Sequence, residues 1–333
     1  MANLIARITA WVLKLKAARA FLLYSEHRGP MLADSVTYRT LFSVFAGVLL
    51  GFSLAGLFLA GNPAALEALV GAVDAAIPGL VGEGGVIDPA DIKIPAGLTL
   101  ATVLSIVGLV GAAIGAIGSL RAAFRSIADT LSDDTFFLWV ILRNLLLAIV
   151  IGAALVAAAG ATFFASAGVG ILNSWLGLSP TDPLPTIATP LISLVVVFAL
   201  DTVVIAVLFR ALSGVRASAR ALWTGALLGG FGLTVLQELS GLFVRGASSN
   251  PLLASFASLI ALLLWLNLSA QVILIAGAYI VTSVEEESDR VKARYGASTF
   301  AQRRVRRAEV AVRVATDELE RARVVEEKER TPA

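Results

Sequence analysis

Long apolar runs separated by short polar connections dominate the pattern of this chain. A run of about 18 or more apolar residues can cross a hydrocarbon core about 30 Å thick. Lipid offers no hydrogen-bond partner for backbone groups, so each such run is predicted to be a transmembrane helix. The predicted fold is therefore an all-α, polytopic membrane bundle. Its six predicted spans are Leu41–Ala60, Leu98–Ile117, Phe136–Ala159, Leu191–Phe209, Leu222–Phe243 and Leu252–Val281.

Composition leads to the same class of protein. Hydrophobic residues make up 58% of the 333 residues and charged residues 15%, against about 45–50% and about 25% in soluble domains. The absence of cysteine excludes disulfides, thiolate zinc sites and iron–sulfur clusters. The basic N-terminal residues precede no short apolar run with a cleavage site, so no cleavable signal peptide is expected.

The distribution of basic residues predicts the orientation. Arg121 and Arg125 lie in the second connection, and Arg210 and Arg220 flank the fourth, whereas the first connection has only Lys93. Basic connections face the cytoplasm in most membrane proteins. We therefore predict a multi-pass protein of a bacterial-type cytoplasmic membrane, with both termini in the cytoplasm.

The chain divides into three predicted segments: 1–39, 40–283 and 284–333. The first is amphipathic, and its apolar positions at helical spacing are Leu4, Ile8, Trp11, Val12, Leu15 and Leu22. Such a helix either lies among anionic lipid headgroups or packs under the bundle. The second segment holds the six spans and a long outer loop, 61–96, which is either a helical cap on the outer mouth or a solvated linker.

The third segment is a charged tail with apolar residues at alternating steps of four and three. These residues are Ala301, Val305, Ala308, Val312, Ala315, Leu319 and Ala322. The spacing is that of a heptad seam, but alanines bury little area. The tail is either a solvated single helix or a weak self-association helix. Its basic cluster near Arg304 favours lipid over nucleic acid as a partner, because acidic residues interrupt the rest of the tail.

Polar side chains inside apolar spans are costly, and they usually face the bundle interior. The candidates for a polar pathway are Asp201, Arg143, Glu238, Asn267 and Gln271. A rise of about 1.5 Å per residue places Arg143 and Asp201 at similar depths, so an ion pair is sterically feasible. The alternative is structural: Arg143 extends to the headgroups, and the two amides bond neighbouring helices.

Glycines four residues apart allow helices to approach closely. Such pairs predict packing faces, with a hinge as the alternative, at Gly47 and Gly51, Gly111 and Gly115, and Gly225 and Gly229. Enzyme chemistry finds no support. His27 is the only histidine, and no phosphate-binding glycine loop with a Lys-Ser/Thr ending occurs. We expect no enzyme activity, cofactor or metal.

Three stretches resemble the YihY/BrkB family of bacterial inner-membrane proteins. They are 32–45, read Leu-Ala-Asp-Ser-Val-Thr-Tyr-Arg-Thr-Leu-Phe-Ser-Val-Phe, 221–227, read Ala-Leu-Trp-Thr-Gly-Ala-Leu, and 264–270, read Leu-Trp-Leu-Asn-Leu-Ser-Ala. The resemblance covers roughly 25–285 and implies a six-span bundle without a settled substrate. It leaves two hypotheses open: a transporter or flippase-like protein for a small solute or lipid, or a non-transporting envelope scaffold or assembly factor.

Overall fold

The computed structural model describes residues 11–59, 71, 100–130, 139–147, 149, 150, 153, 183–248, 257–288 and 299–330. Its main helices are α2 (Lys16–Glu26), α3 (Gly29–Leu59), α5 (Leu100–Ile127), α7 (Pro183–Leu212), α8 (Ala219–Ser248), α9 (Ala257–Ser288) and α11 (Phe300–Arg330). Within these ranges there is no strand, which confirms the all-α class. The outer loop 61–96, apart from Gly71, and much of the third predicted span lie outside the described residues.

Three of the described helices are long and apolar enough to cross a membrane. They contain the candidate spans Leu194–Leu212, Ala219–Leu239 and Leu259–Ser288. These segments coincide with the fourth, fifth and sixth predicted spans. The count of six spans stays a prediction.

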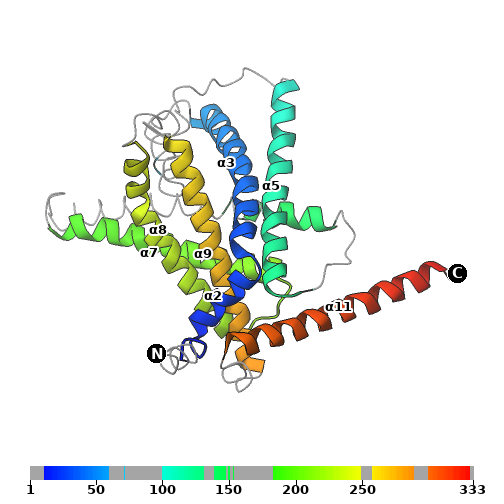
Figure 1. The fold of residues 1–333 in the computed structure, drawn as a ribbon. Coiled ribbons are helices and arrows are strands. Elements are labelled where there is room, and N and C mark those ends of the chain that lie inside the picture. The colour runs from blue at the N-terminus through cyan, green and yellow to red at the C-terminus, as the bar shows by residue number, and fades with distance from the viewer. Residues whose placement is uncertain are drawn as a thin grey trace.

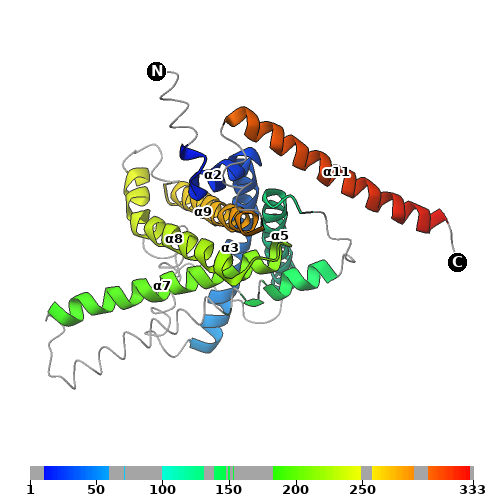
Figure 2. The same ribbon diagram turned by 90° about the horizontal axis from the view of Figure 1, so that it is seen from below.

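Helix α9 is the central element of the described bundle. It contacts α2, α3, α5, α7 and α8. Figure 1 shows α3, α5, α8 and α9 running in broadly the same direction, whereas α7 slants across them. We call the end of the bundle that holds α2, the α7–α8 connection and the start of α11 the basal end (Figures 1 and 2).

Glycines allow α8 to lie very close to α9. A Cβ added at Gly225 would be 3.2 Å from the carbonyl oxygen of Ala276, and one at Gly229 would be 2.7 Å from the Ala276 Cβ. One turn further along, a Cβ at Gly232 would be 2.8 Å from Val272 Cγ1. The absence of side chains at these three positions of α8 therefore allows the two helices to lie this close together.

The other glycine pairs have looser surroundings. A Cβ at Gly47 would lie 3.9 Å from Leu109, and one at Gly115 would lie 3.5 Å from the Arg39 guanidinium. A Cβ at Gly111 would meet nothing within 4 Å among the described residues. Gly51 lies within α3.

The hydrophobic core lies toward the basal end, where α2, α3, α5, α7 and α9 meet. The rings of Phe124 and Phe209 pack edge to face with centroids 5.6 Å apart. Gly277 of α9 leaves room for Phe124, since a Cβ there would be 2.5 Å from the ring. Tyr24 of α2 is also buried here, and burial raises the pKa of its hydroxyl to about 12, so Tyr24 stays neutral.

A sharp break separates α2 from α3. Arg28 has a φ of 54°, in the left-handed region. Gly29 follows, where a Cβ would be 2.2 Å from the Tyr24 ring. Pro30 then lies in the first turn of α3, where its missing N–H costs no helical hydrogen bond.

Helix α2 has one packed face and one free face. Arg19, Ala20, Leu23 and Tyr24 are buried, while Trp11, Leu15 and Phe21 nearby are exposed. Trp11 and Leu15 belong to the predicted apolar stripe but precede α2, whereas Leu22, the stripe residue within α2, is partly buried.

Helix α11 begins beside α2 and then leaves the bundle. The Thr299 hydroxyl caps its first turn by accepting a hydrogen bond from the Gln302 N–H at 3.2 Å. Figures 1 and 2 show the helix passing α5 at the periphery and extending outward, crosswise to α3 and α9.

Candidate polar sites in the bundle

A chain of hydrogen bonds joins α3 to α9. The Asn267 Nδ2 donates to Asp34 Oδ1 at 2.8 Å and approaches Thr37 Oγ1 at 3.4 Å. The Gln271 Nε2 donates to Asn267 Oδ1 at 2.7 Å. Two of the predicted polar residues are thus bonded to each other, and they connect to a carboxylate on another helix.

A second polar contact joins α7 to α8. The Gln237 Nε2 donates to Asp201 Oδ2 at 3.3 Å. Both side chains are partly buried. The amide orients a carboxylate that would otherwise be costly between apolar helices.

The two polar contacts lie at the same level of the bundle. Gly229 lies against Ala276 and Gly232 against Val272, so a turn along α8 matches a turn back along α9. Continuing this register for five residues along α8 places Gln237 near the level of Leu268. The Asp201–Gln237 contact and the Asn267 chain therefore flank the α8–α9 pair at one height.

Arg143 and Glu238 lie apart from these contacts. Arg143 donates to the carbonyl oxygen of Ala211 at the basal end of α7. Among the described residues it forms no ion pair with Asp201. Glu238 is exposed, although its neighbour Gln237 faces α7. The five predicted residues thus fall into two bonded groups and two separate side chains.

Two buried polar side chains of α9 lie within one turn of Asn267. Trp265 and Ser269 are each 8% exposed, and the Trp265 Nε1 and Ser269 Oγ have no hydrogen-bond partner among the described residues. Trp265 lies two turns from Val272, on the face of α9 that contacts α8. An unpaired buried donor is costly, so these groups are suited to bind a polar ligand.

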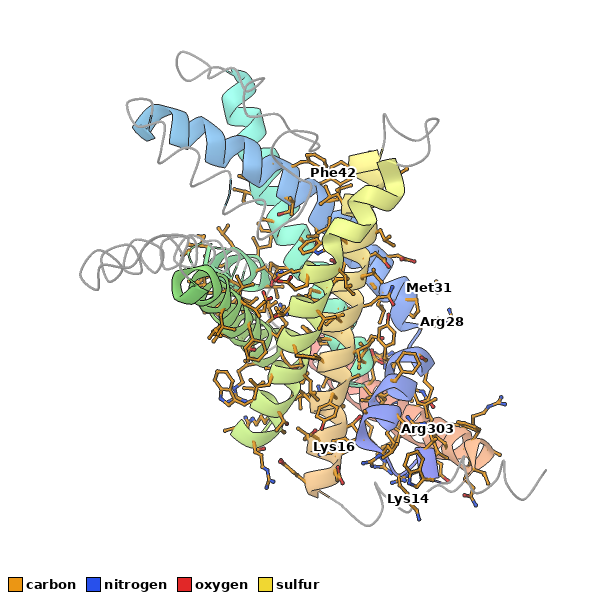
Figure 3. The ribbon with its side chains drawn as sticks, turned by 90° about the vertical axis from the view of Figure 1, so that its left-hand side faces the viewer. Lys14, Lys16, Arg28, Met31, Phe42 and Arg303 are labelled. Carbon is orange, nitrogen blue, oxygen red and sulfur yellow. The ribbon has the colours of Figure 1, made fainter. Side chains whose placement is uncertain are left out.

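A separate cluster at the basal end holds α11 against α2. Glu26 accepts hydrogen bonds from Arg303 Nε at 2.7 Å and from Arg307 Nη1 at 3.2 Å. The adjacent His27 ring contacts Arg307 and, through Nε2, lies 3.0 Å from Asp129 Oδ1. Figure 3 shows Arg303 close to the α2 helix that carries Lys16.

A second set of ion pairs holds α2 against α9. The Lys16 Nζ lies 3.0 Å from Glu286 Oε2, and Arg19 Nη2 lies 3.3 Å from the same oxygen. Lys16 also lies over the Tyr279 ring, 5.7 Å from its centroid. The basal end is therefore joined by charges on three elements.

Sequence reasoning passed over several members of these sites. Asp34 lies seven residues before Leu41, where the first predicted span begins, so the search for polar residues inside the spans did not include it. The sequence interpretation selected the charged residue Glu238 and passed over the uncharged amide Gln237 next to it. His27 and Asp129 are 102 residues apart in sequence, and only the fold brings them together. Gln237 could have been found from the sequence, because it is an amide inside a predicted span and follows the glycines of that span at helical spacing.

A comparison with family models gives one match. The model described as Virulence factor BrkB matches residues 20–299. No curated protein and no solved structure shows significant similarity to the chain.

Proposed function

Because the chain belongs to the Virulence factor BrkB family of membrane proteins, we propose that it moves a small polar solute or lipid across the membrane. The observation that carries the proposal is the level of polar groups on both sides of the α8–α9 pair. Asp201 with Gln237 lies on one side, and Asn267 with Asp34 on the other.

The free-energy cost of placing these polar side chains in a bundle of apolar helices supports a functional role for them. Carboxylates and amides between apolar helices are expensive to retain, and in membrane proteins they commonly line substrate or ion pathways. The unpaired donors of Trp265 and Ser269 add binding capacity at the same height. A polar solute or a lipid headgroup would satisfy them.

The orientation follows from charge. The basal end carries Arg210, Arg216 and Arg220 around the α7–α8 connection, together with the basic start of α11. Under the rule that basic connections face the cytoplasm, the basal end is cytoplasmic in this proposal. Both termini then lie on that side.

The test uses protein purified in native nanodiscs and analysed by mass spectrometry for bound lipids and metabolites. Asp201→Asn removes the charge and leaves an oxygen that can still accept from Gln237. Glu238→Gln is the matched control, since it removes a neighbouring but exposed carboxylate. We expect a co-purifying molecule that Asp201→Asn loses and Glu238→Gln retains.

The same variants show whether a change reflects folding. Each should keep the thermal unfolding midpoint of the wild type within a few degrees. Bulk lipid alone, identical in all three proteins, would contradict the transport proposal and leave Asp201 with a structural role.

A second candidate function is favoured by α11. A helix of 31 residues that leaves the bundle suits a membrane scaffold or assembly factor. Deleting 296–333 separates the two functions. A scaffold loses its cellular phenotype while the molecule bound in nanodiscs is unchanged, whereas a transporter retains its activity.

A further inference from the structure

The outward face of α11 carries an unbroken apolar seam. Val305, Val312 and Leu319 are 61%, 66% and 51% exposed. The alanines that alternate with them, at 301, 308, 315 and 322, are exposed as well. No described residue covers this seam, although it runs along seven positions of the helix.

The contacts at the start of α11 fix which way the seam faces. Arg303 and Arg307 bind Glu26 on the bundle side. Successive helical residues turn by about 100°, so Val305, two residues from each arginine, points to the opposite side. The seam therefore faces away from the bundle, at the periphery seen in Figure 2.

We propose that the seam of α11 binds the same seam of a second copy of this chain, with the two helices antiparallel. Two copies inserted the same way in one membrane are related by a two-fold axis along the membrane normal. Helix α11 lies crosswise to that direction (Figure 1). A two-fold axis reverses any helix lying across it, and the resulting interface is self-complementary.

The side chains of the seam fit the antiparallel arrangement. In that pairing each large residue opposes an alanine: Val305 meets Ala322, Leu319 meets Ala308, and Val312 meets Ala315. Each layer then has a similar volume, as a well-packed core requires. A parallel pair would oppose Val with Val and Ala with Ala, leaving wide and narrow layers in alternation.

The position of the basic cluster also favours the antiparallel arrangement. The half of α11 next to the bundle carries Arg303, Arg304, Arg306 and Arg307. A parallel pair would place the clusters of the two copies side by side, and like charges in contact oppose association. The antiparallel register instead places each cluster opposite residues 320–324, which contain Glu320, Arg321 and Arg323.

Cysteine cross-linking tests the arrangement directly, because the natural chain has no cysteine. Val305→Cys and Ala322→Cys are made in two differently tagged full-length chains and co-expressed in membranes. Antiparallel pairing gives a disulfide between the two tags. Asp317→Cys, on the face opposite the seam, is the matched control and should not cross-link.

The alternatives give different products. A Val305→Cys homodimer in place of the mixed dimer indicates parallel helices and overturns the proposal. No cross-link at any seam position indicates a helix that binds lipid or is solvated alone, which also overturns it. Loss of solute in the nanodisc experiment leaves these results unaffected, so the two proposals fail independently.

Discussion

At the residue scale, Nε2 of His27 has two neighbours, Asp129 and Arg307. One protonation state of the ring cannot form favourable hydrogen bonds with both. Its Nδ1 lies 2.9 Å from the Leu23 carbonyl oxygen, which only accepts, so Nδ1 carries a proton. The neutral ring then has a lone pair on Nε2 that accepts from Arg307. The cationic ring has an Nε2–H that donates to Asp129 and repels Arg307.

These contacts predict that His27 takes part in attaching α11 to the bundle. Replacing His27 with alanine removes the acceptor of Arg307, so the distance between spin labels at Ser126→Cys and Val312→Cys should broaden or lengthen. An unchanged distance would contradict this prediction.

A second prediction at this scale concerns Asn267. Replacing it with leucine leaves Asp34 and Gln271 without their shared partner. An intramolecular hydrogen bond contributes about 0.5–1.5 kcal/mol to stability, so losing the bonds of Asn267 to Asp34 and Gln271 should lower the thermal unfolding midpoint in detergent. Thr224→Val is the control, because the Thr224 hydroxyl bonds only carbonyls of its own helix; an equal fall in both variants would contradict the prediction.

At the element scale, the pairing of α8 and α9 depends on missing side chains. A Cβ at Gly229 would be 2.7 Å from both Ala276 Cβ and Ile205 Cδ1. Contacts this short require α8 to move away from α7 or α9. The close helix pair is therefore a property of the glycine positions in α8 rather than of apolar area alone.

Gly229→Ala should destabilise the protein by about 1–3 kcal/mol through overpacking, seen as a lower unfolding midpoint. Gly111→Ala is the matched control from another glycine pair, since its Cβ meets nothing within 4 Å among the described residues. Alanine favours a helix over glycine by about 0.5–1 kcal/mol, so the control should be neutral or slightly stabilised. Equal losses in both variants would show that α8 has no special role.

At the scale of the whole molecule, charge concentrates at one end. Helix α2, the end of α5, the α7–α8 connection and the start of α11 all meet there. Ser218 of that connection donates to Glu287 of α9 at 2.9 Å, and Thr130, just past α5, donates to the Ser213 carbonyl at 3.0 Å. Connections far apart in sequence thus share one side of the bundle.

This arrangement predicts a common side for three labelled positions. Single cysteines at Ser126, Arg216 and Ala315 should all be unreactive toward a membrane-impermeant maleimide in intact cells and reactive after lysis. We expect this because the end is basic, and basic connections face the cytoplasm in most membrane proteins. Labelling of any of the three in intact cells would contradict the orientation.

The sequence by itself determined the all-α class, the fourth to sixth apolar segments and the family. It could do so because apolar run length and helical spacing are local properties of the chain. The seam of α11 was visible for the same reason. The tertiary structure alone decided that Gln237, not Glu238, meets Asp201, and that Asp34 meets Asn267, because these partners lie on different helices. It also decided that Arg19, Ala20, Leu23 and Tyr24 form the packed face of α2, because burial depends on which helices lie beside it.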